Sequence, residues 1–395
     1  MKIRLTFILL IVVTLFSGSS LAQAARPDAP AYAKRGAYLV GTRELRIEDA
    51  KRPLDAAIWY PALNPEHKKV EAEYRFLMLA GTGQALRDAP PDPSGGPYPL
   101  IVYSHGLGGA KYQSVFYLEQ LASYGFVVIA VDHPGSTFGN ITMDAIIENI
   151  ALRPLDVLRE IAFAETWNAD GGVLAGLIDT DRIGVTGHSF GGYTALSAGG
   201  ARIDFDALRV WCASNPDPAL QPDEPCGLLQ YEQQIATIRG LTDIPHGIWP
   251  ATTDPRIKAI VLHAPWNAVS YQETGLAEVT APLMVLVGSV DGSILPERDA
   301  YPLYDRVHST IKAQVVFENA NHYIFVDECI PALILIGQHR RCSDEVWDMP
   351  RAHDLIDHFS TAFFLMTLKG DADAAQAIDP GTVRFVGVDY KAELK

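Results

Sequence analysis

The sequence of 395 residues lacks the features that most directly indicate nucleic-acid binding or a metal site. It has 32 Lys and Arg residues against 47 Asp and Glu residues, so its formal net charge is −15. A chain this acidic is not expected to bind nucleic acid or an anionic membrane surface. It contains no Cys-x-x-Cys or His-Glu-x-x-His pattern. We therefore expect neither a metal ion nor another cofactor.

Long hydrophobic runs are also scarce, and the one clear example lies near the N-terminus. Lys2 and Arg4 flank an apolar run over residues 5–16, and Ala22-Gln23-Ala24 follows as a small-x-small cleavage pattern. This arrangement predicts a signal peptide over residues 1–24, and hence a secreted or periplasmic protein with no stable membrane span after cleavage. A membrane anchor is the alternative, but spanning a bilayer takes about 20 apolar residues, and the run over residues 5–16 is shorter than that.

Cysteine is rare too, with four residues that fall into two local pairs. Cys212 and Cys226 form one pair, and Cys329 and Cys342 form the other. An even number of cysteines in an exported chain favours disulfides, and of the three possible pairings we expect the two local ones. A zinc site is the alternative, but no metal-binding pattern accompanies these residues.

What the sequence does contain is a repeated alternation of apolar strands with amphipathic helices. This pattern is typical of an α/β fold with a mostly parallel sheet covered by helices on both faces. We predict eight strands, of which the first two are antiparallel. The expected strands cover residues 37–47, 54–60, 99–104, 126–132, 182–186, 257–263, 283–288 and 313–317, and the expected helices cover 113–124, 151–167, 191–198 and 351–368.

Two segments interrupt this alternation within a single α/β domain predicted over residues 37–370. Residues 201–255 hold one cysteine pair and little periodicity, and we interpret them as a cap over the active site. A surface excursion that only packs on the sheet is the alternative. Residues 323–350 form a smaller insertion with the other pair, and residues 371–395 are predicted to be a C-terminal tail.

The sharpest motif is Gly-His-Ser-Phe-Gly-Gly over residues 187–192, which follows a predicted strand and precedes a predicted helix. A G-x-S-x-G motif in this context is typical of a strained turn that exposes a nucleophilic serine. Ser189 is therefore the candidate nucleophile, and glycines 187 and 191 would be small because backbone passes close to the turn. A simple turn with a capping serine is the alternative.

A serine nucleophile needs a base, and in this fold the acid and the base follow it in the order Asp or Glu, then His. His322 follows the last predicted strand by a short polar loop and is the candidate base. Asp291 is the first carboxylate after the preceding strand and is the candidate acid. Glu297 is the second choice for the acid and Asp327 the third. His263 could line the site without being the base.

A second glycine-rich segment, Tyr-Ser-His-Gly-Leu-Gly-Gly over residues 103–109, follows another strand. Such a loop can direct backbone N–H groups at the oxyanion of an acyl-transfer reaction. We expect the N–H groups of Leu107 and Phe190 to form this oxyanion hole, and His105 to brace the loop. A phosphate-binding loop is excluded because its lysine and spacing are missing.

Taken together with residues 54–61 (Leu-Asp-Ala-Ala-Ile-Trp-Tyr-Pro), these motifs resemble the secreted platelet-activating-factor acetylhydrolases. They also resemble bacterial lipases and esterases described as predicted dienelactone hydrolases. The resemblance covers roughly residues 40–325 and implies an α/β-hydrolase fold and a metal-free esterase for short or modest acyl groups. It departs from true dienelactone hydrolases, whose nucleophile is cysteine. The residues it implies as functional are Ser189, Asp291, His322, Leu107 and Phe190.

The predicted function is hydrolysis of a small-molecule or lipid carboxylic ester through an acyl-enzyme. We expect His105, Gly106, His188 and Trp266 to contribute to the substrate pocket, although a core position would explain Trp266 equally well. Polyester or aromatic-ester hydrolysis, acyl transfer to an alcohol and peptide hydrolysis are alternatives that use the same triad. A binding protein without activity is the alternative from another class.

Overall fold

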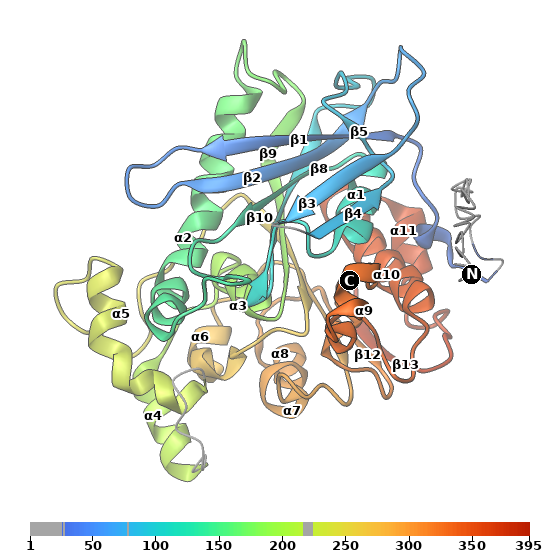
Figure 1. The fold of residues 1–395 in the computed structure, drawn as a ribbon. Coiled ribbons are helices and arrows are strands. Elements are labelled where there is room, and N and C mark those ends of the chain that lie inside the picture. The colour runs from blue at the N-terminus through green and yellow to red at the C-terminus, as the bar shows by residue number, and fades with distance from the viewer. Residues whose placement is uncertain (1–25, 27, 77–78, 216–223) are drawn as a thin grey trace, which may run out of the picture.

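The structure, a computed structural model, describes residues 26, 28–76, 79–215 and 224–395. The predicted signal peptide, 1–24, lies outside the described residues. A ten-stranded sheet runs through the protein in the order β13-β12-β11-β10-β9-β6-β8-β2-β1-β5 (Figure 1). Neighbouring strands from β8 to β12 pair in parallel, whereas β1 and β2 pair antiparallel with each other. The α/β fold class and the antiparallel start are thus confirmed.

All eight predicted strands are present, and most of them are apolar runs that are buried on both faces of the sheet, whereas β1 alternates buried and exposed residues in its second half. β6, β10 and β11 show this most clearly, since nearly every residue in them is buried. The corresponding strands are β1 (Leu39–Ile47), β2 (Leu54–Ala62), β6 (Tyr98–Ser104), β8 (Val127–Asp132), β9 (Ile178–His188), β10 (Ile257–His263), β11 (Leu283–Gly288) and β12 (Lys312–Phe317).

The prediction of eight strands is nevertheless too low, because short and half-exposed strands extend both edges of the sheet. β5 (Leu86–Arg87) pairs with β1, and β13 (Val388–Glu393) pairs antiparallel with β12. Every second residue of β13 is exposed, so it lacks the continuous apolar run that marks the inner strands. β3 (Ala72–Phe76) and β4 (Leu79–Gly83) form a separate antiparallel pair between the predicted strands 54–60 and 99–104, where no strand is predicted. β7 (Gly108–Gly109) is a short bridge.

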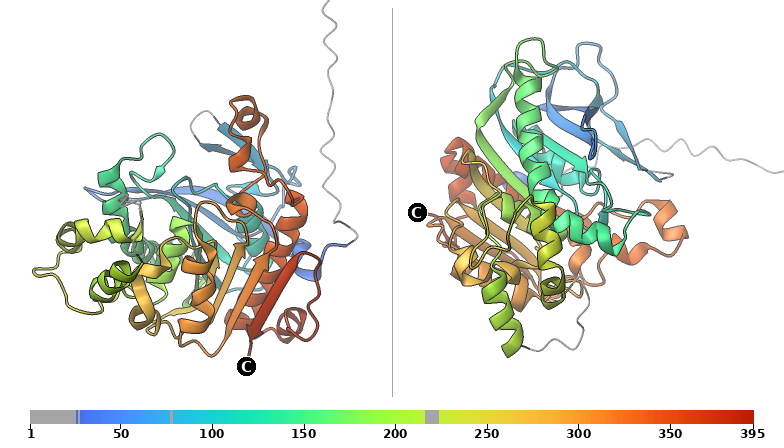
Figure 2. Two further views of the ribbon diagram at one scale, coloured as in Figure 1. Left: turned by 90° about the horizontal axis from the view of Figure 1, so that it is seen from below. Right: turned by 90° about the vertical axis from the view of Figure 1, so that its left-hand side faces the viewer.

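Helices cover both faces of the sheet (Figure 2). α1 and α10 pack on each other and on one face, and α2 and α3 pack on the other. Asp348 caps the start of α10 by accepting a hydrogen bond from the Arg351 N–H, and Gly370 ends it in the left-handed conformation. The helices are α1 (Val115–Ser123), α2 (Met143–Asn168), α3 (Phe190–Ala198), α4 (Phe205–Ser214), α5 (Glu232–Ile238), α6 (Gln272–Leu276), α7 (Pro296–Asp299), α8 (Tyr301–Arg306), α9 (Pro331–Leu335), α10 (Met349–Lys369) and α11 (Ala372–Ala377).

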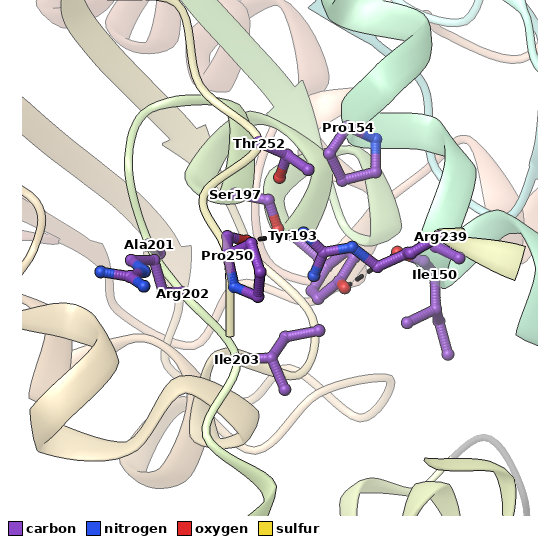
Figure 3. A pocket seen from close by; sticks show the side chains of 11 residues that line it. Ile150, Pro154, Tyr193, Ser197, Ala201, Arg202, Ile203, Arg239, Pro250 and Thr252 are labelled. Carbon is purple, nitrogen blue, oxygen red and sulfur yellow. Dashed lines mark hydrogen bonds between the residues drawn. The ribbon is translucent and has the colours of Figure 1, made fainter. Parts of the chain in front are cut away.

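The described part of the predicted cap, residues 201–255, packs beside the sheet domain. α5 contacts α2, and α4 contacts η3 (Ala268–Tyr271). Phe205 and Trp249 are buried with their ring centroids 5.0 Å apart, and both belong to the hydrophobic core that the segment shares with the sheet. A cavity of only about 10 Å³ lies between residues of this segment and residues of α2 and α3 (Figure 3). Such a space holds at most one water molecule, so it is not a substrate site. The role of the segment as a cap stays a prediction.

Both predicted disulfides are confirmed, which excludes the zinc alternative for these residues. The Cα atoms of Cys212 and Cys226 lie 5.8 Å apart, and those of Cys329 and Cys342 lie 4.9 Å apart. The second bridge closes a projecting segment that contains α9 and η5 (His339–Arg341). Among the described residues, no helix combines the length and the apolar composition needed to cross a membrane.

Candidate active site

Ser189 sits at the junction of β9 and α3 in a strained backbone conformation. Its φ of 57° and ψ of −117° are unusual for a residue other than glycine. The Ser189 N–H donates to the His263 carbonyl, and the Ser189 carbonyl accepts from the Trp266 N–H. These bonds attach the turn to the neighbouring strand β10 and the loop after it. The local structure is therefore the strained turn that the motif predicts.

The two glycines that flank Ser189 are required by close backbone contacts. A Cβ atom at position 187 would lie 2.3 Å from the Gly191 carbonyl oxygen. At position 191 it would lie 1.8 Å from the Ser104 carbonyl oxygen. Real Cβ atoms do not approach so closely, so any larger residue would displace the turn or strand β6. The packing therefore agrees with the expectation that backbone passes close to both positions.

Asp291 and His322 form a buried hydrogen-bonded pair at the same end of the sheet as Ser189. His322 Nδ1 lies 2.6 Å from Asp291 Oδ2. The other carboxylate oxygen of Asp291 accepts hydrogen bonds from the N–H groups of Ser293 and Ile294. The carboxylate is thus held in one orientation and can fix the proton of His322 on Nδ1. This arrangement leaves His322 Nε2 available to accept a proton.

The alternative acids occupy different positions. Glu297 is exposed on α7. Asp327 accepts a hydrogen bond from the Phe116 N–H at the start of α1, and burial raises its pKa to about 7. Neither is bonded to His322, so Asp291 is the carboxylate that the geometry favours.

Two other histidines that follow Ser189 in the sequence lie on the last helix. His353 and His358 are both buried on α10. His353 stacks on Phe116 at 3.6 Å between ring centroids, and its Nε2 bonds to the Val326 carbonyl. These residues pack the helix against its neighbours and are engaged away from Ser189.

The loop that follows β6 passes beside Ser189 and carries the Leu107 N–H. The N–H of Gly106 donates to the Gln113 side chain, that of Gly108 to the Ser136 carbonyl and that of Gly109 to the Gly106 carbonyl. No acceptor for the Leu107 N–H is found in the described part of the chain. Phe190 is the first residue of α3, and N–H groups there have no partner within the helix. Both N–H groups can therefore serve an oxyanion.

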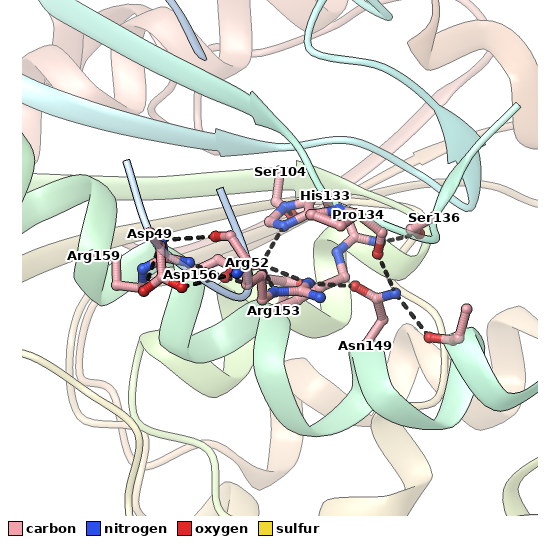
Figure 4. Close-up of polar contacts among 12 residues, drawn as sticks. Asp49, Arg52, Ser104, His133, Pro134, Ser136, Asn149, Arg153, Asp156 and Arg159 are labelled. Atoms are coloured by element: carbon pink, nitrogen blue, oxygen red, sulfur yellow. Dashed lines mark hydrogen bonds and ion pairs between the residues drawn. The ribbon is translucent and has the colours of Figure 1, made fainter. Parts of the chain in front are cut away.

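A buried polar network that includes Arg153, His133 and Asp156 supports the loop after β6 (Figure 4). Arg153, fully buried on α2, donates to the carbonyl of His105 and to Ser104 Oγ, and its guanidinium lies 4.6 Å from the centre of the Phe190 ring. His133 Nδ1 lies 2.9 Å from Asp156. Burial would raise the pKa of Asp156, but the hydrogen bonds from His133 and Arg52 lower it to about 2. The network thus contacts the loop that carries Leu107 and the ring of Phe190, the two residues that supply the candidate oxyanion hole.

This network also determines which residues of α2 are buried. The three-four spacing over residues 151–167 predicts an apolar face made of Leu152, Leu155, Leu158, Ile161 and Ala162. Ile161 is buried as expected, but the three leucines are only half-buried and Ala162 is exposed. Arg153, Asp156 and Glu160 are buried instead. Charged residues can occupy a buried face when they are paired, and Asp156 is paired with Arg52 and His133. A charged stripe at helical spacing inside an apolar helix was the available sequence signal.

The four residues expected in the substrate pocket divide into two groups. His105, Gly106 and His188 are buried, and the rings of both histidines bond to protein groups. Their hydrogen bonds hold the loops of the candidate site, and a direct contact with substrate stays a prediction. Trp266 is half-buried and packs on Phe190 with ring centroids 4.9 Å apart. Trp266 is thus the one of the four with a partly open face.

The buried His263 is expected to make the stability of the protein depend on pH. Burial lowers its pKa to about 3, whereas the unfolded chain titrates near 6.5. Between these values the unfolded state binds a proton that the folded state lacks, so stability falls as pH falls. From pH 7.5 to 5.5, we expect wild type to lose about 1.4 kcal/mol more unfolding free energy than His263→Phe. Urea unfolding of both proteins at both pH values measures this difference, and parallel losses would contradict it.

Comparison with known proteins agrees with this architecture. The chain is similar to the platelet-activating factor acetylhydrolase of the dog, Canis lupus familiaris, with 25% identity over 253 residues. That alignment covers 47% of this chain and 54% of the relative, so the chain spans about half the length of the relative it matches. A match to the alpha/beta hydrolase family covers residues 101–329, which is more than half of the chain and includes Ser189, Asp291 and His322. The protein therefore belongs to the alpha/beta hydrolase family.

Proposed function

We propose that the protein is a serine esterase, with Ser189 as nucleophile, His322 as base and Asp291 as the acid that orients it. The observation that carries the proposal is the placement of a strained serine and a buried Asp–His pair at one end of the sheet. His322 is joined to the residue before Ser189, because the His188 Nε2–H donates to the His322 carbonyl over 3.0 Å. The rings of these two histidines lie 4.5 Å apart.

The reaction would proceed in two steps. His322 Nε2 takes the proton from Ser189 as its Oγ bonds to the ester carbonyl carbon, and the resulting oxyanion is held by the N–H groups of Leu107 and Phe190. The C–O bond to the alcohol then breaks, and His322 returns its proton to the leaving oxygen. Water, deprotonated by His322, attacks the acyl-enzyme and releases the acid and free Ser189.

An ester with an apolar group of modest size is the substrate class that the surroundings favour. Leu107 is 39% exposed beside the candidate oxyanion hole, and Phe138 and Ile141 are exposed on the adjoining loop. Ile141 lies next to Gly108, so this apolar surface continues from the loop that holds Leu107. The acetylhydrolase named among the relatives also supports a short acyl group. The half-buried Trp266 favours aromatic esters as a second candidate.

We further propose that residues 1–24 are a signal peptide and that the enzyme is secreted or periplasmic. Two disulfides are compatible with that location, since such bonds persist in oxidising compartments.

A series of 4-nitrophenyl esters (acetate, butyrate and octanoate) with matched 4-nitroanilides tests the function. We expect turnover of the esters with an optimum at a short or intermediate acyl chain, and no measurable turnover of the anilides. Adding a primary alcohol should divert only a minor share of the acyl group from water. Preferred cleavage of the anilides would indicate a peptidase, and dominant transfer to the alcohol an acyltransferase.

A further inference from the structure

Gln113, which precedes α1, connects the two halves of the candidate site. Its Oε1 accepts a hydrogen bond of 2.7 Å from the Gly106 N–H, in the loop that presents the Leu107 N–H. Its Nε2 lies 2.9 Å from His188 Nδ1. Because a backbone N–H can only donate, the amide oxygen must face Gly106, and the NH₂ group must face the histidine.

The orientation of this amide fixes the proton of His188. Nδ1 must accept from Gln113, so the ring proton lies on Nε2, which donates to the His322 carbonyl. The ring of His188 is buried against the rings of His322 and Phe325, with His263 nearby, and no carboxylate among the described residues perturbs it. Burial, with the nearby His322, lowers the pKa of His188 well below its usual value, which keeps the ring neutral and able to accept.

The backbone of Gln113 makes a second connection to the same segment. Its carbonyl accepts a hydrogen bond of 2.9 Å from the N–H of Asp327, five residues after His322. One residue thus holds the loop of Leu107 with its side-chain oxygen, and the segment of His322 both through His188 and through its own carbonyl.

We propose that Gln113 is a positioning residue that fixes the candidate oxyanion loop relative to the candidate base. This inference rests on the proposed function, because it assigns Leu107 and His322 to one reaction. Without the amide of Gln113, the loop of Leu107 and the segment of His322 would both remain folded, but nothing at this position would fix one relative to the other. Misalignment of this kind lowers the rate of the chemical step more than it weakens substrate binding.

The first test is Gln113→Met, which keeps the length of the side chain but removes the donor and the acceptor. We expect kcat to fall about 10- to 100-fold, with KM changed less than about threefold. Gln120→Met is the matched control, because Gln120 is a glutamine of α1 whose amide likewise makes two hydrogen bonds, donating to the carbonyls of Tyr32 and Lys34. The control should lose similar thermal stability but retain its kcat. A kcat of Gln113→Met within twofold of wild type would overturn the proposal.

The second test is Gln113→Glu, which separates positioning from simple packing. While the new carboxyl group and His188 Nδ1 share one proton, the hydrogen bond between them is preserved. This holds whether the proton is on the carboxyl group or on the ring nitrogen. Without this proton, two acceptors face each other across the same gap. The kcat/KM of the variant relative to wild type should therefore be close to one at pH 6 and fall about tenfold or more by pH 9. A ratio that does not change with pH would overturn the proposal.

A substrate-independent readout distinguishes failure of this inference from failure of the proposed function. The rate at which a fluorophosphonate labels Ser189 reports the reactivity of the serine itself. If wild type neither reacts with the probe nor hydrolyses any ester, the proposed function is wrong. If wild type reacts and Gln113→Met reacts equally fast, the proposed function stands and the positioning role is wrong.

Discussion

Replacement of Ser189 by alanine is expected to lower kcat for ester hydrolysis by about 10⁵-fold or more, while the protein stays folded. The serine oxygen forms the covalent bond to the acyl group in the proposed reaction, and alanine has no atom that can take its place. The backbone of the turn should persist, because its bonds to His263 and Trp266 come from main-chain atoms. Initial rates on 4-nitrophenyl butyrate, with thermal unfolding of the same samples, give both quantities.

Ser197→Ala is the matched control for this experiment. Ser197 lies on the same helix, α3, and is buried with its hydroxyl 2.6 Å from that of Tyr271. It should lose some stability and keep its activity. Mass spectrometry after fluorophosphonate treatment should detect one added label on wild type and on Ser197→Ala, and none on Ser189→Ala. Wild-type rates in Ser189→Ala would refute the proposed nucleophile.

The second large effect is expected for Asp291→Asn, with a loss of about 10⁴-fold in kcat and little change in KM. The asparagine oxygen can still accept from Ser293 and Ile294, which directs its NH₂ group at His322 Nδ1. That nitrogen must then accept, so the ring proton moves to Nε2. A histidine in this tautomer cannot take the proton of Ser189.

Glu297→Gln tests the alternative acid in the same way. Glu297 is exposed on α7, and we expect its kcat to remain within about twofold of wild type, as for most surface substitutions. Steady-state kinetics of both variants on one ester decide between the two carboxylates. A large loss in Glu297→Gln together with a small loss in Asp291→Asn would reverse the assignment.

The elements that sequence reasoning predicts best are those specified by continuous apolar runs. β10 and β11 are buried along almost their whole length, and their boundaries agree with the prediction. β5 and β13 were not predicted, because a two-residue strand and a half-exposed edge strand carry no comparable pattern. Their pairing depends on the neighbouring strands rather than on their own composition.

Some residues of the candidate site can be predicted from the sequence and others cannot. The motif around Ser189 and the loops after β11 and β12 indicate Asp291 and His322, because the ends of parallel strands lie at one edge of the sheet. Gln113 and Arg153 could not be identified in this way. Each acts through hydrogen bonds to carbonyls, N–H groups or rings that lie far away in the sequence, such as the 2.9 Å contact between Gln113 and His188. Contacts of this kind become visible only when the chain is folded.

The bridge between Cys329 and Cys342 makes the residues it encloses replaceable without change to the rest of the domain. The two Cα atoms are 4.9 Å apart, so the residues between them leave and rejoin the domain at almost one point. The entropic cost of closing a loop rises only slowly with the length of the loop. The hydrogen bond that holds the segment before His322 comes from outside the bridged loop, because Asp344 accepts it from the Asn321 N–H. The enclosed segment is therefore a natural insertion point, open to replacement by recombination or by a grafted peptide while the sheet keeps its geometry.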